Sequence, residues 1–192
     1  MKKIAVFASG NGSNAQAIAE HFNQGNDARV IVILSNRKDA FVIQRAADLA
    51  IPAIVFNRSE FYDTDNITNY LIDEKIDLVV LAGFLWLLPS SLVKAFPNRI
   101  VNIHPALLPK FGGKGMYGHF VHEAVVAAGE AQSGITIHYV NEHYDEGQII
   151  FQVHCNVDHS DTADSLAAKI HELEYAHFPR VIDEVIKTID PT

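Results

Sequence analysis

Two residue types that act in acyl transfer lie next to each other near the middle of the chain. Asn102 and His104 flank a single apolar residue at the end of the run Arg99-Ile-Val-Asn-Ile-His104. If this run is a β-strand, residues two apart point to the same face, which places the amide beside the imidazole. An amide N–H can donate to a developing oxyanion, and an imidazole can donate or move a proton. The pair therefore predicts acyl-transfer chemistry that requires neither a metal nor a covalent nucleophile.

A carboxylate that could complete this catalytic group follows in the segment Asp145-Glu-Gly147. A carboxylate close to an imidazole favours the cationic, donating form of the ring, so Asp145 is expected to raise the pKa of His104. Each of the three residues also has a purely structural interpretation. His104 would then bond a nearby carbonyl, Asn102 would be a buried amide, and Asp145 would be a hairpin-turn residue.

A glycine-rich turn near the start of the chain has the composition of an anion-binding site. The turn Gly10-Asn-Gly-Ser-Asn-Ala15 follows an apolar run and precedes a helical stretch, as in the relaxed dinucleotide-binding fingerprint. Glycines let the backbone approach a phosphate, and the N-terminus of the helix offers free N–H groups. Ser13 and Asn14 add side-chain donors, although either residue could simply cap the helix. The next apolar run ends in Ser35-Asn-Arg-Lys38, without the acidic residue of an NAD site, so NADP remains an alternative ligand.

Composition excludes several classes of protein. A chain of 192 residues with 48% apolar and 20% charged residues is expected to form one compact domain rather than a disordered or membrane protein. The formal net charge of −8 argues against a nucleic-acid-binding face. Cys155 is the only cysteine, and the apolar start of the chain stops at Gly10, too early for a signal peptide, so a cytoplasmic protein is expected. His171 and His177 are six positions apart, which misses the spacing of helical metal ligands, so no metal is expected.

Apolar runs and helical stretches alternate along the chain, which indicates the fold class. Runs rich in β-branched residues that alternate with helices are typical of a parallel sheet covered on both faces. After a glycine-rich loop at 106–118, two strand-like runs follow each other and indicate an antiparallel pair. We therefore expect an α/β, Rossmann-like, mostly parallel sheet with helices on both faces and a C-terminal antiparallel extension. The expected strands are Ile4–Ala8, Val30–Leu34, Ala53–Val55, Leu78–Ala82, Ile100–Ile103, Gly134–Val140 and Gln148–Val153; the expected helices are Ala15–Phe22, Ala40–Ala50, Ile67–Lys75, Ser90–Phe96, Val121–Ala128 and Ala163–Lys187, the last open to interruption at Pro179.

Several short segments spread over the chain carry a family resemblance. They are Ser9–Asn14, Leu34–Arg37, Val80–Phe84, Val101–Lys110, Gly134–His138, Asp145–Gly147 and His171–Glu174. Together they resemble the folate-dependent formyltransferase family over nearly the whole chain. The Gly-Asn-Gly-Ser-Asn turn narrows the resemblance to the phosphoribosylglycinamide formyltransferases of purine biosynthesis. The resemblance implies transfer of the formyl group of 10-formyltetrahydrofolate to the amine of glycinamide ribonucleotide.

The resemblance also implies roles for individual residues. Residues 1–192 would form a single formyltransferase domain, with a phosphate- and nucleotide-binding half at 1–100 and a catalytic and folate-binding half at 101–192. The implied partners are the two small-molecule substrates, with no nucleic acid, no membrane and no metal, in a monomer or a homodimer. The implied sites are Gly12, Ser13, Asn14 and Glu174 for the ribonucleotide; Leu85, Trp86, Leu87, Leu88, Asn102, Asn141 and Asp145 for the folate; and Asn102, His104 and Asp145, supported by His138, for catalysis.

Two positions depart from the family pattern, and other functions stay open. Phe120 stands where relatives often have a histidine, and Trp86 stands where some have a cation or a smaller residue. His138 and Trp86 could instead belong to the core, and Glu174 could be a solvated helix residue. The alternative functions are hydrolysis of formyltetrahydrofolate, formylation of another amine, and an NADP-binding oxidoreductase or nucleotide-binding module. The last of these leaves the catalytic group without a role.

Overall fold

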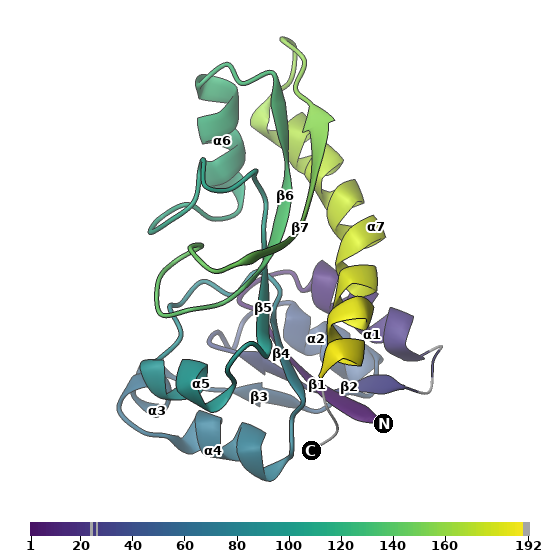
Figure 1. Cartoon of the computed structure of the whole chain (residues 1–192), viewed down its shortest axis with the longest axis vertical. Coiled ribbons are helices and arrows are strands. Elements are labelled where there is room, and N and C mark those ends of the chain that lie inside the picture. Colours follow the sequence, from purple (N-terminus) through teal and green to yellow (C-terminus); the bar gives the residue numbers. More distant parts are fainter. Residues whose placement is uncertain (24, 26, 190–192) are drawn as a thin grey trace.

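A single seven-stranded sheet organises the chain (Figure 1). The computed structural model describes residues 1–23, 25 and 27–189. Its strands are β1 (Lys2–Phe7), β2 (Ala28–Ser35), β3 (Ala53–Val55), β4 (Leu78–Leu81), β5 (Ile100–His104), β6 (Gln132–Tyr139) and β7 (Ile149–Asn156). They lie in the order β3-β2-β1-β4-β5-β6-β7; the pairs from β3 to β5 are parallel, and β6 and β7 are antiparallel to their neighbours. The predicted fold class, including the antiparallel extension, is therefore confirmed.

Helices cover both faces of the sheet because side chains alternate along its buried strands. They are α1 (Ser13–Asn23), α2 (Val42–Asp48), α3 (Arg58–Tyr62), α4 (Asn66–Asp73), α5 (Ser90–Ala95), α6 (His119–Ala127) and α7 (Ala163–Thr188). On β1, Ile4 and Val6 enter a core shared with α1, α2, α6 and α7. Ala5 and Phe7 enter a second core shared with α3, α4 and α5. The two cores hold the sheet rigidly between them, so its strand ends can position side chains.

The sequence-based expectations missed one helix, α3. This helix has five residues, too short for an apolar period to reveal it. Its start does carry a local signal, because Asn57 and Glu60 form a capping box. The Asn57 side chain accepts from the Glu60 N–H at 3.0 Å, and Glu60 accepts from the Asn57 N–H at 2.8 Å. The other expected elements are present, with their ends shifted by a few residues.

The last helix is not interrupted at Pro179, a point that the sequence left open. Helix α7 runs without a break from Ala163 to Thr188, with Pro179 inside it. Proline removes one backbone hydrogen bond, but Phe178 and Ile182 on either side are fully buried and anchor both segments in the same core. Tertiary packing therefore outweighs the local preference. No helix among the described residues is long and apolar enough to span a membrane.

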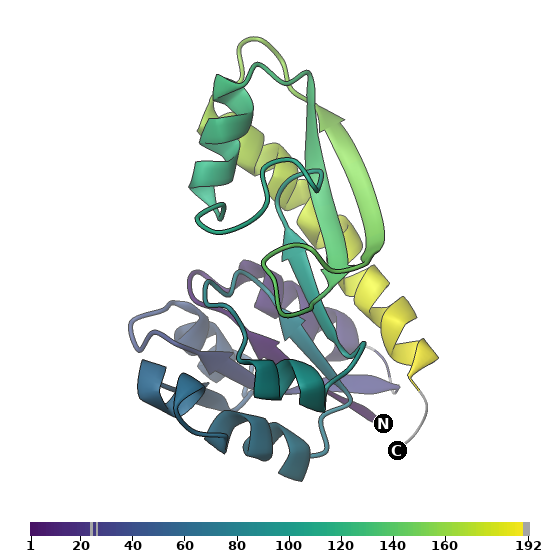
Figure 2. The ribbon, with the colours of Figure 1, turned by 60° about the vertical axis from the view of Figure 1, so that its left-hand side comes forward.

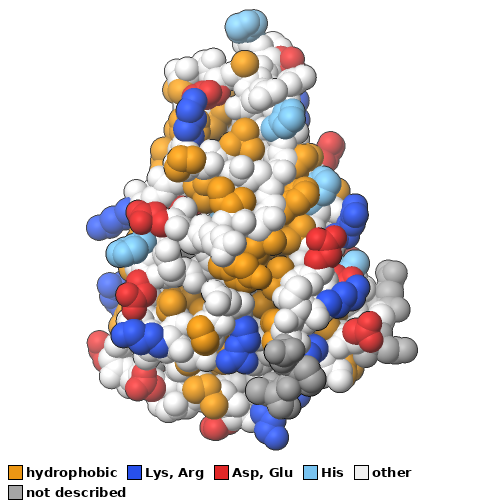
Figure 3. Space-filling view, in the orientation of Figure 1, with side chains coloured by type: hydrophobic (Ala, Val, Ile, Leu, Met, Phe, Trp, Pro, Cys, Tyr) orange, Lys and Arg blue, Asp and Glu red, His pale blue; other side chains and the backbone are white. Residues whose placement is uncertain are grey.

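The parallel and antiparallel parts of the sheet form two lobes joined by α7. Figure 2 shows β6, β7 and α6 rising above the parallel strands, with α7 running alongside both parts. Consistent with this view, α7 contacts α1, α6, β5, β6 and β7. On the face shown in Figure 3, apolar side chains gather along the middle and charged side chains lie mostly around the edge. The two lobes meet at β5, whose end therefore faces the space between them.

Candidate active site

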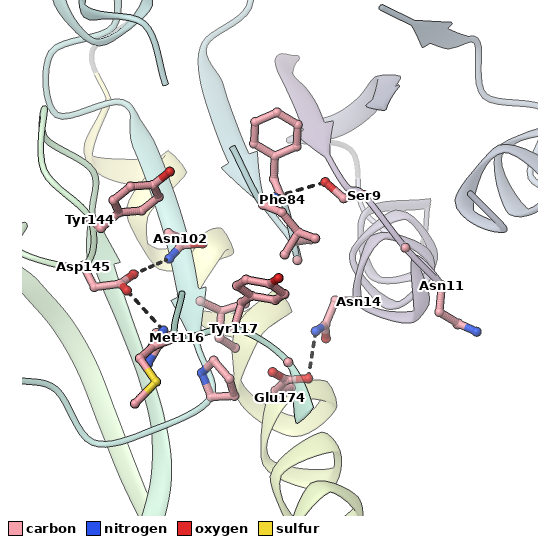
Figure 4. Close-up of a pocket in the computed structure, with 18 of the residues that line it drawn as sticks. Ser9, Asn11, Asn14, Phe84, Asn102, Met116, Tyr117, Tyr144, Asp145 and Glu174 are labelled. Carbon is pink, nitrogen blue, oxygen red and sulfur yellow. Dashed lines mark hydrogen bonds and ion pairs between the residues drawn. The ribbon is translucent and has the colours of Figure 1, made fainter. Parts of the chain in front are cut away.

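The carboxyl ends of β1, β4 and β5 open into a cavity of about 620 Å³ (Figure 4). Open α/β sheets bind their ligands at this edge, where the loops leave neighbouring strands. The loop 113–118 and residues of α6 and α7 complete the wall. Predicted site residues from five separate segments line this one cavity: Gly12, Ser13, Asn14, Leu85, Asn102, His104, Asp145 and Glu174.

Asn102, His104 and Asp145 come together at one end of the cavity, as the sequence predicts. The Nδ2 atom of Asn102 lies 3.5 Å from Oδ1 of Asp145, and Nδ1 of His104 lies 3.5 Å from Oδ2 of Asp145. Both contacts are long, so they are weak as hydrogen bonds and leave the amide and the ring free to reach a reacting group. Asp145 itself is held more tightly, because Oδ2 accepts the Gly113 N–H at 2.9 Å.

The hydrogen bonds of His104 define which ring nitrogen faces Asp145. The Nε2 atom lies 2.7 Å from the carbonyl oxygen of Phe111. A carbonyl oxygen only accepts, so Nε2 carries the hydrogen in the neutral ring and Nδ1 presents its lone pair to Asp145. Uptake of a second proton would place an N–H at Nδ1, beside the carboxylate. His104 can therefore act as a proton acceptor or donor through Nδ1 while Nε2 anchors it.

Burial decides the pKa of His104. The residue is 3% exposed, and this burial lowers the pKa below its ordinary value. The charge of Asp145 and the Phe111 carbonyl act in the opposite direction but do not compensate. Asp145 thus acts in the predicted direction, yet the expectation that His104 is held in its cationic form is wrong for the free protein. The sequence predicted that Asp145 lies near His104, but it did not reveal how deeply His104 is buried.

Asp145 is an anion in this environment. Burial alone would raise its pKa, but the nearby rings of His138 and His104 and the N–H of Gly113 lower it below the ordinary value. Its loop is fixed by a close backbone contact, because a Cβ on Gly147 would lie only 1.6 Å from the Tyr139 carbonyl oxygen. The carboxylate is therefore a stable negative charge at a defined position.

His138 lies where the predicted supporting role requires. It pairs with Asn102 across β5 and β6, and its Nδ1 lies 2.8 Å from the Tyr139 carbonyl, which assigns the hydrogen to that nitrogen. The other nitrogen, Nε2, accepts from Asn102 Nδ2 at 3.1 Å. This contact fixes the orientation of the Asn102 amide, with its N–H groups toward His138 and Asp145.

The glycine-rich turn forms the opposite end of the cavity. Gly12 has φ of +77°, and a Cβ there would lie 2.3 Å from the Val42 side chain, so no other residue fits this approach. Ser13 is the first residue of α1, where backbone N–H groups have no partner inside the helix. Arg45 donates to the carbonyl and the side-chain oxygen of Asn11 at 2.8 and 2.7 Å and holds the turn in place. The turn therefore has the geometry of an anion-binding site.

Glu174 joins the turn to the last helix. Its Oε2 accepts from Asn14 Nδ2 at 2.9 Å and from His171 Nδ1 at 3.0 Å. The residue is 6% exposed, so the alternative interpretation of a solvated helix residue is wrong. Its hydrogen bond raises the pKa of His171. Figure 4 shows Asn14 and Glu174 together on one side of the cavity and Asn102 and Asp145 on the other.

The residues expected around the folate divide between two cavities. Leu85 lines the main cavity, whereas Trp86, Leu87 and Leu88 line a smaller one of about 60 Å³. The two cavities share Phe84, Asn102, Tyr144 and Asp145.

Trp86 and Asn141 have mainly structural contacts. Trp86 packs in an aromatic cluster with Phe56, Phe61, Tyr62 and Phe84, as its core interpretation predicts. Asn141 is not among the lining residues of either cavity, and its side chain accepts the His143 N–H at 2.9 Å. Phe120 is 54% exposed and stacks edge-on against Tyr117.

Sequence reasoning missed some residues of the cavity wall. Two of them, His122 and His171, lie on helices that face the cavity. The spacing of His171 and Glu174 by three positions was an available signal, because such residues are neighbours on a helix. His122 has Val125 and Val126 three and four positions further along α6, so no acidic partner at that spacing gave a signal. Among the described residues, no group of three or more His, Cys, Asp and Glu side chains is arranged to hold a metal ion.

Comparison with known families identifies the family of the chain that contains this cavity. A family model described as formyl transferase matches residues 2–182. The chain belongs to the formyl transferase family. Among curated relatives of this formyl transferase, the chloroplastic phosphoribosylglycinamide formyltransferase of Arabidopsis thaliana is 42% identical over 96% of this chain and 65% of the relative. The phosphoribosylglycinamide formyltransferase of Bacillus subtilis (strain 168) is 36% identical over 97% of this chain and 95% of the relative.

Solved structures agree with this membership. The crystal structure of phosphoribosylglycinamide formyltransferase from Streptococcus pneumoniae TIGR4 is similar to this formyl transferase with a TM-score of 0.85 and 41% identity, covering 96% of this chain and 99% of that one. The chain spans less than two thirds of the plant relatives, with 65% and 60% of their lengths. The resemblance inferred from sequence, to the phosphoribosylglycinamide formyltransferases, is confirmed.

Proposed function

We propose that this formyl transferase moves the formyl group of 10-formyltetrahydrofolate to the amine of glycinamide ribonucleotide, a step of purine biosynthesis. One observation carries the proposal. An anion-binding turn and a group made of an amide, an imidazole and a carboxylate lie at two ends of one cavity. A phosphorylated amine that spans the cavity would place its phosphate at the first end and its amine at the second.

The ribonucleotide is assigned to the end near α1. The phosphate would lie against Gly12, Ser13 and Asn14, where free backbone N–H groups and the positive end of the helix dipole favour an anion. Glu174 would accept hydrogen bonds from the ribose or the glycinamide end. Its oxygen already accepts from Asn14 and His171, so it is correctly oriented before the ligand binds.

The folate is assigned to the other side of the catalytic group. Leu85 supplies an apolar wall, and the smaller cavity lined by Trp86, Leu87 and Leu88 continues from the main cavity through shared residues. Asn102 and Asp145 border both cavities, so both substrates would meet there. Asn141 would contribute only after a change of its loop, because its side chain accepts the His143 N–H.

The reaction follows from the positions of the three side chains. The lone pair of the substrate amine forms a bond to the formyl carbon, and the carbonyl electron pair moves onto oxygen. Asn102 Nδ2 and Nδ1 of His104, once protonated, donate to this oxyanion and lower the barrier. Collapse of the intermediate breaks the bond from carbon to N10 of the folate, and N10 takes up a proton. Asp145, as the fixed anion, accepts the amine proton through water and returns it to N10.

The two halves of the chain do not act separately in this proposal. Residues 1–100 supply the anion-binding turn, and residues 101–192 supply the catalytic group and the 141–145 wall. Glu174, however, lies in the second half and contacts the first. A monomer or a homodimer can perform this chemistry, and light scattering would identify which one forms. The cytoplasmic location stays a prediction.

Turnover with glycinamide ribonucleotide and 10-formyltetrahydrofolate tests the proposal directly. The folate absorbance should change only when both substrates are present. Release of formate without the amine would identify a hydrolase instead, and turnover with other amines would identify a broader formyltransferase. A change in the nicotinamide absorbance with NADPH would identify the oxidoreductase alternative.

A further inference from the structure

The wall of the main cavity contains a buried imidazole that the proposed reaction does not use. His122 on α6 is 3% exposed and lines the cavity. Its Nδ1 atom is buried and has no hydrogen-bond partner among the described residues. Val121 and Val125 on the same helix are also buried, so packing alone could be served by a third apolar side chain. A buried polar atom without a partner destabilises a fold, and this one therefore calls for a physical explanation.

His122 is neutral at physiological pH. Burial is the main cause that lowers its pKa to about 4, and the nearby rings of His171, His119 and His104 act in the same direction against the charge of Glu174. A neutral imidazole offers one N–H donor and one lone pair. With this pKa it is too weak a base to move the substrate's proton near neutral pH. Its chemistry is therefore that of a hydrogen-bonding group.

The position of His122 indicates which part of a ligand it would meet. The groups that act on it electrostatically include members of both ends of the cavity: Glu174, which contacts Asn14 and His171, and His104 of the catalytic group. A second buried polar atom without a partner, Oδ1 of Asn14, lies beside Glu174, to which Asn14 Nδ2 donates. Two buried polar atoms of the cavity wall are thus unsatisfied, one on α6 and one beside Glu174 at the end of the cavity near α1.

We propose that His122 forms a hydrogen bond with the ribose–glycinamide part of the ribonucleotide and selects it over other phosphorylated amines. This inference rests on the proposed function. The hydroxyl and amide groups of that part carry both donors and acceptors, which match a neutral imidazole and the Asn14 carbonyl oxygen. A ligand without such groups would leave these atoms buried and unpaired, and sites of this kind discriminate strongly for that reason.

Two substitutions of His122 separate recognition from packing. His122→Leu removes both ring nitrogens, and His122→Asn keeps a polar atom near the position of Nδ1. We expect His122→Leu to raise KM for glycinamide ribonucleotide about tenfold and to leave KM for 10-formyltetrahydrofolate unchanged, as for a lost hydrogen bond. His122→Asn should recover most of the loss. The melting temperature of His122→Leu should not fall, because the substitution removes an unsatisfied buried atom.

His119 provides a matched control on the same helix. It is half exposed and lies 3.4 Å from Glu123 and 3.7 Å from Asp164, so His119→Gln should change neither KM. An active His122→Leu protein with an unchanged KM for the ribonucleotide would overturn the inference. A wild-type protein without formyl transfer would overturn the proposed function instead, so the two failures are distinguishable.

A measurement on the wild-type protein keeps the inference testable if His122→Leu does not fold. With ¹⁵N-labelled histidine, the ring signals of His122 should shift when glycinamide ribonucleotide is added. Inorganic phosphate alone should leave them unchanged, because it occupies only the end near α1. Equal shifts with both probes, or a shift with neither, would show that His122 does not contact the ribose–glycinamide part.

Discussion

The two ends of the cavity differ in the groups that would interact with a charged part of the substrate. At the end near α1, the Gly12–Asn14 turn presents backbone N–H groups at the start of the helix, so an anion is attracted without any change in ionisation. At the other end, buried side chains carry the chemistry, and burial has already moved the pKa of His104 downward. Backbone donors survive every substitution except proline, whereas each side chain can be removed. Damage at the first end should therefore weaken binding, and damage at the second should slow turnover.

The largest effect is expected from His104→Ala. The substitution removes the imidazole that is proposed to donate to the oxyanion, so kcat should fall by roughly 10²–10⁴ with little change in either KM. Steady-state kinetics with both substrates varied would measure this. His154 is exposed on β7, and His154→Ala serves as the control. Near-normal turnover of His104→Ala would contradict the assignment of catalysis to this end of the cavity.

Asn102→Ala should have the next largest effect. The loss of one donor to the oxyanion should lower kcat by about 10²–10³. Because Asn102 Nδ2 also contacts His138 at 3.1 Å, the melting temperature should be recorded with the kinetics. A fall in kcat that simply follows unfolding would assign Asn102 to structure rather than to catalysis.

At the other end, Ser13→Ala should act on binding. The loss of a hydrogen bond to a charged phosphate should cost about 1.5–3 kcal/mol of ribonucleotide affinity, while folate affinity stays the same. Asn14→Ala should be more complex, because Asn14 also donates to Glu174. Calorimetry with each ligand alone is the measurement. Equal losses for both ligands from Ser13→Ala would contradict the separation of the two ends.

Asp145→Asn tests the electrostatic link within the catalytic group. Asp145 raises the pKa of His104 against the larger effect of burial, so removal of the charge should lower that pKa further. The remaining activity should then rise toward acid, because only the cationic ring donates through Nδ1. NMR titration of His104 in the wild type and the variant would show the shift. Glu146→Gln, at the exposed neighbouring position, should leave the titration unchanged.

The smallest effect is expected far from the cavity, at the ion pair of Asp161 and Lys169. Their 2.6 Å contact helps lower the pKa of Asp161 to about 2, from 3.8 as the ordinary value. A carboxyl whose pKa is lower in the folded than in the unfolded protein stabilises the fold at any pH above its unfolded pKa. This contribution disappears as the pH falls from about 4 through about 2. Lys169→Met should thus lower the melting temperature slightly at pH 7 and not at pH 2. Altered kcat or KM in this variant would show that a charge outside the cavity affects catalysis or substrate binding.

Local patterns account for the parts of the site that were predicted from sequence. The two-residue period of β5 placed Asn102 beside His104, and the glycines of the first turn indicated backbone approach to an anion. Both features depend only on residues that are close together in the chain, so they can be predicted from sequence. The parallel order of the sheet was inferred for the same reason, from alternation of strands and helices.

The parts that were not predicted depend on three-dimensional packing. The pKa of His104 follows from its burial, which no run of residues around it reveals. Trp86 lies against Phe56 and Phe61 because α3 and the 84–88 segment meet above the sheet, and α3 itself was too short to detect. Glu174 is buried where α7 packs against α1. In each case the deciding contact joins segments that are far apart in the chain.

The hydrogen bond between Asn14 and Glu174 joins residues 160 positions apart. Ribosomes release the chain from its N-terminus, so the first turn emerges long before the residue that orients it. A nascent chain that has not reached α7 carries Asn102, His104 and Asp145 but lacks Glu174 and the buried side chains that support α1 and β6. Prematurely terminated products would thus carry the reactive side chains and the first turn without Glu174, which completes the substrate site. The complete substrate site therefore forms only after α7 has been synthesised.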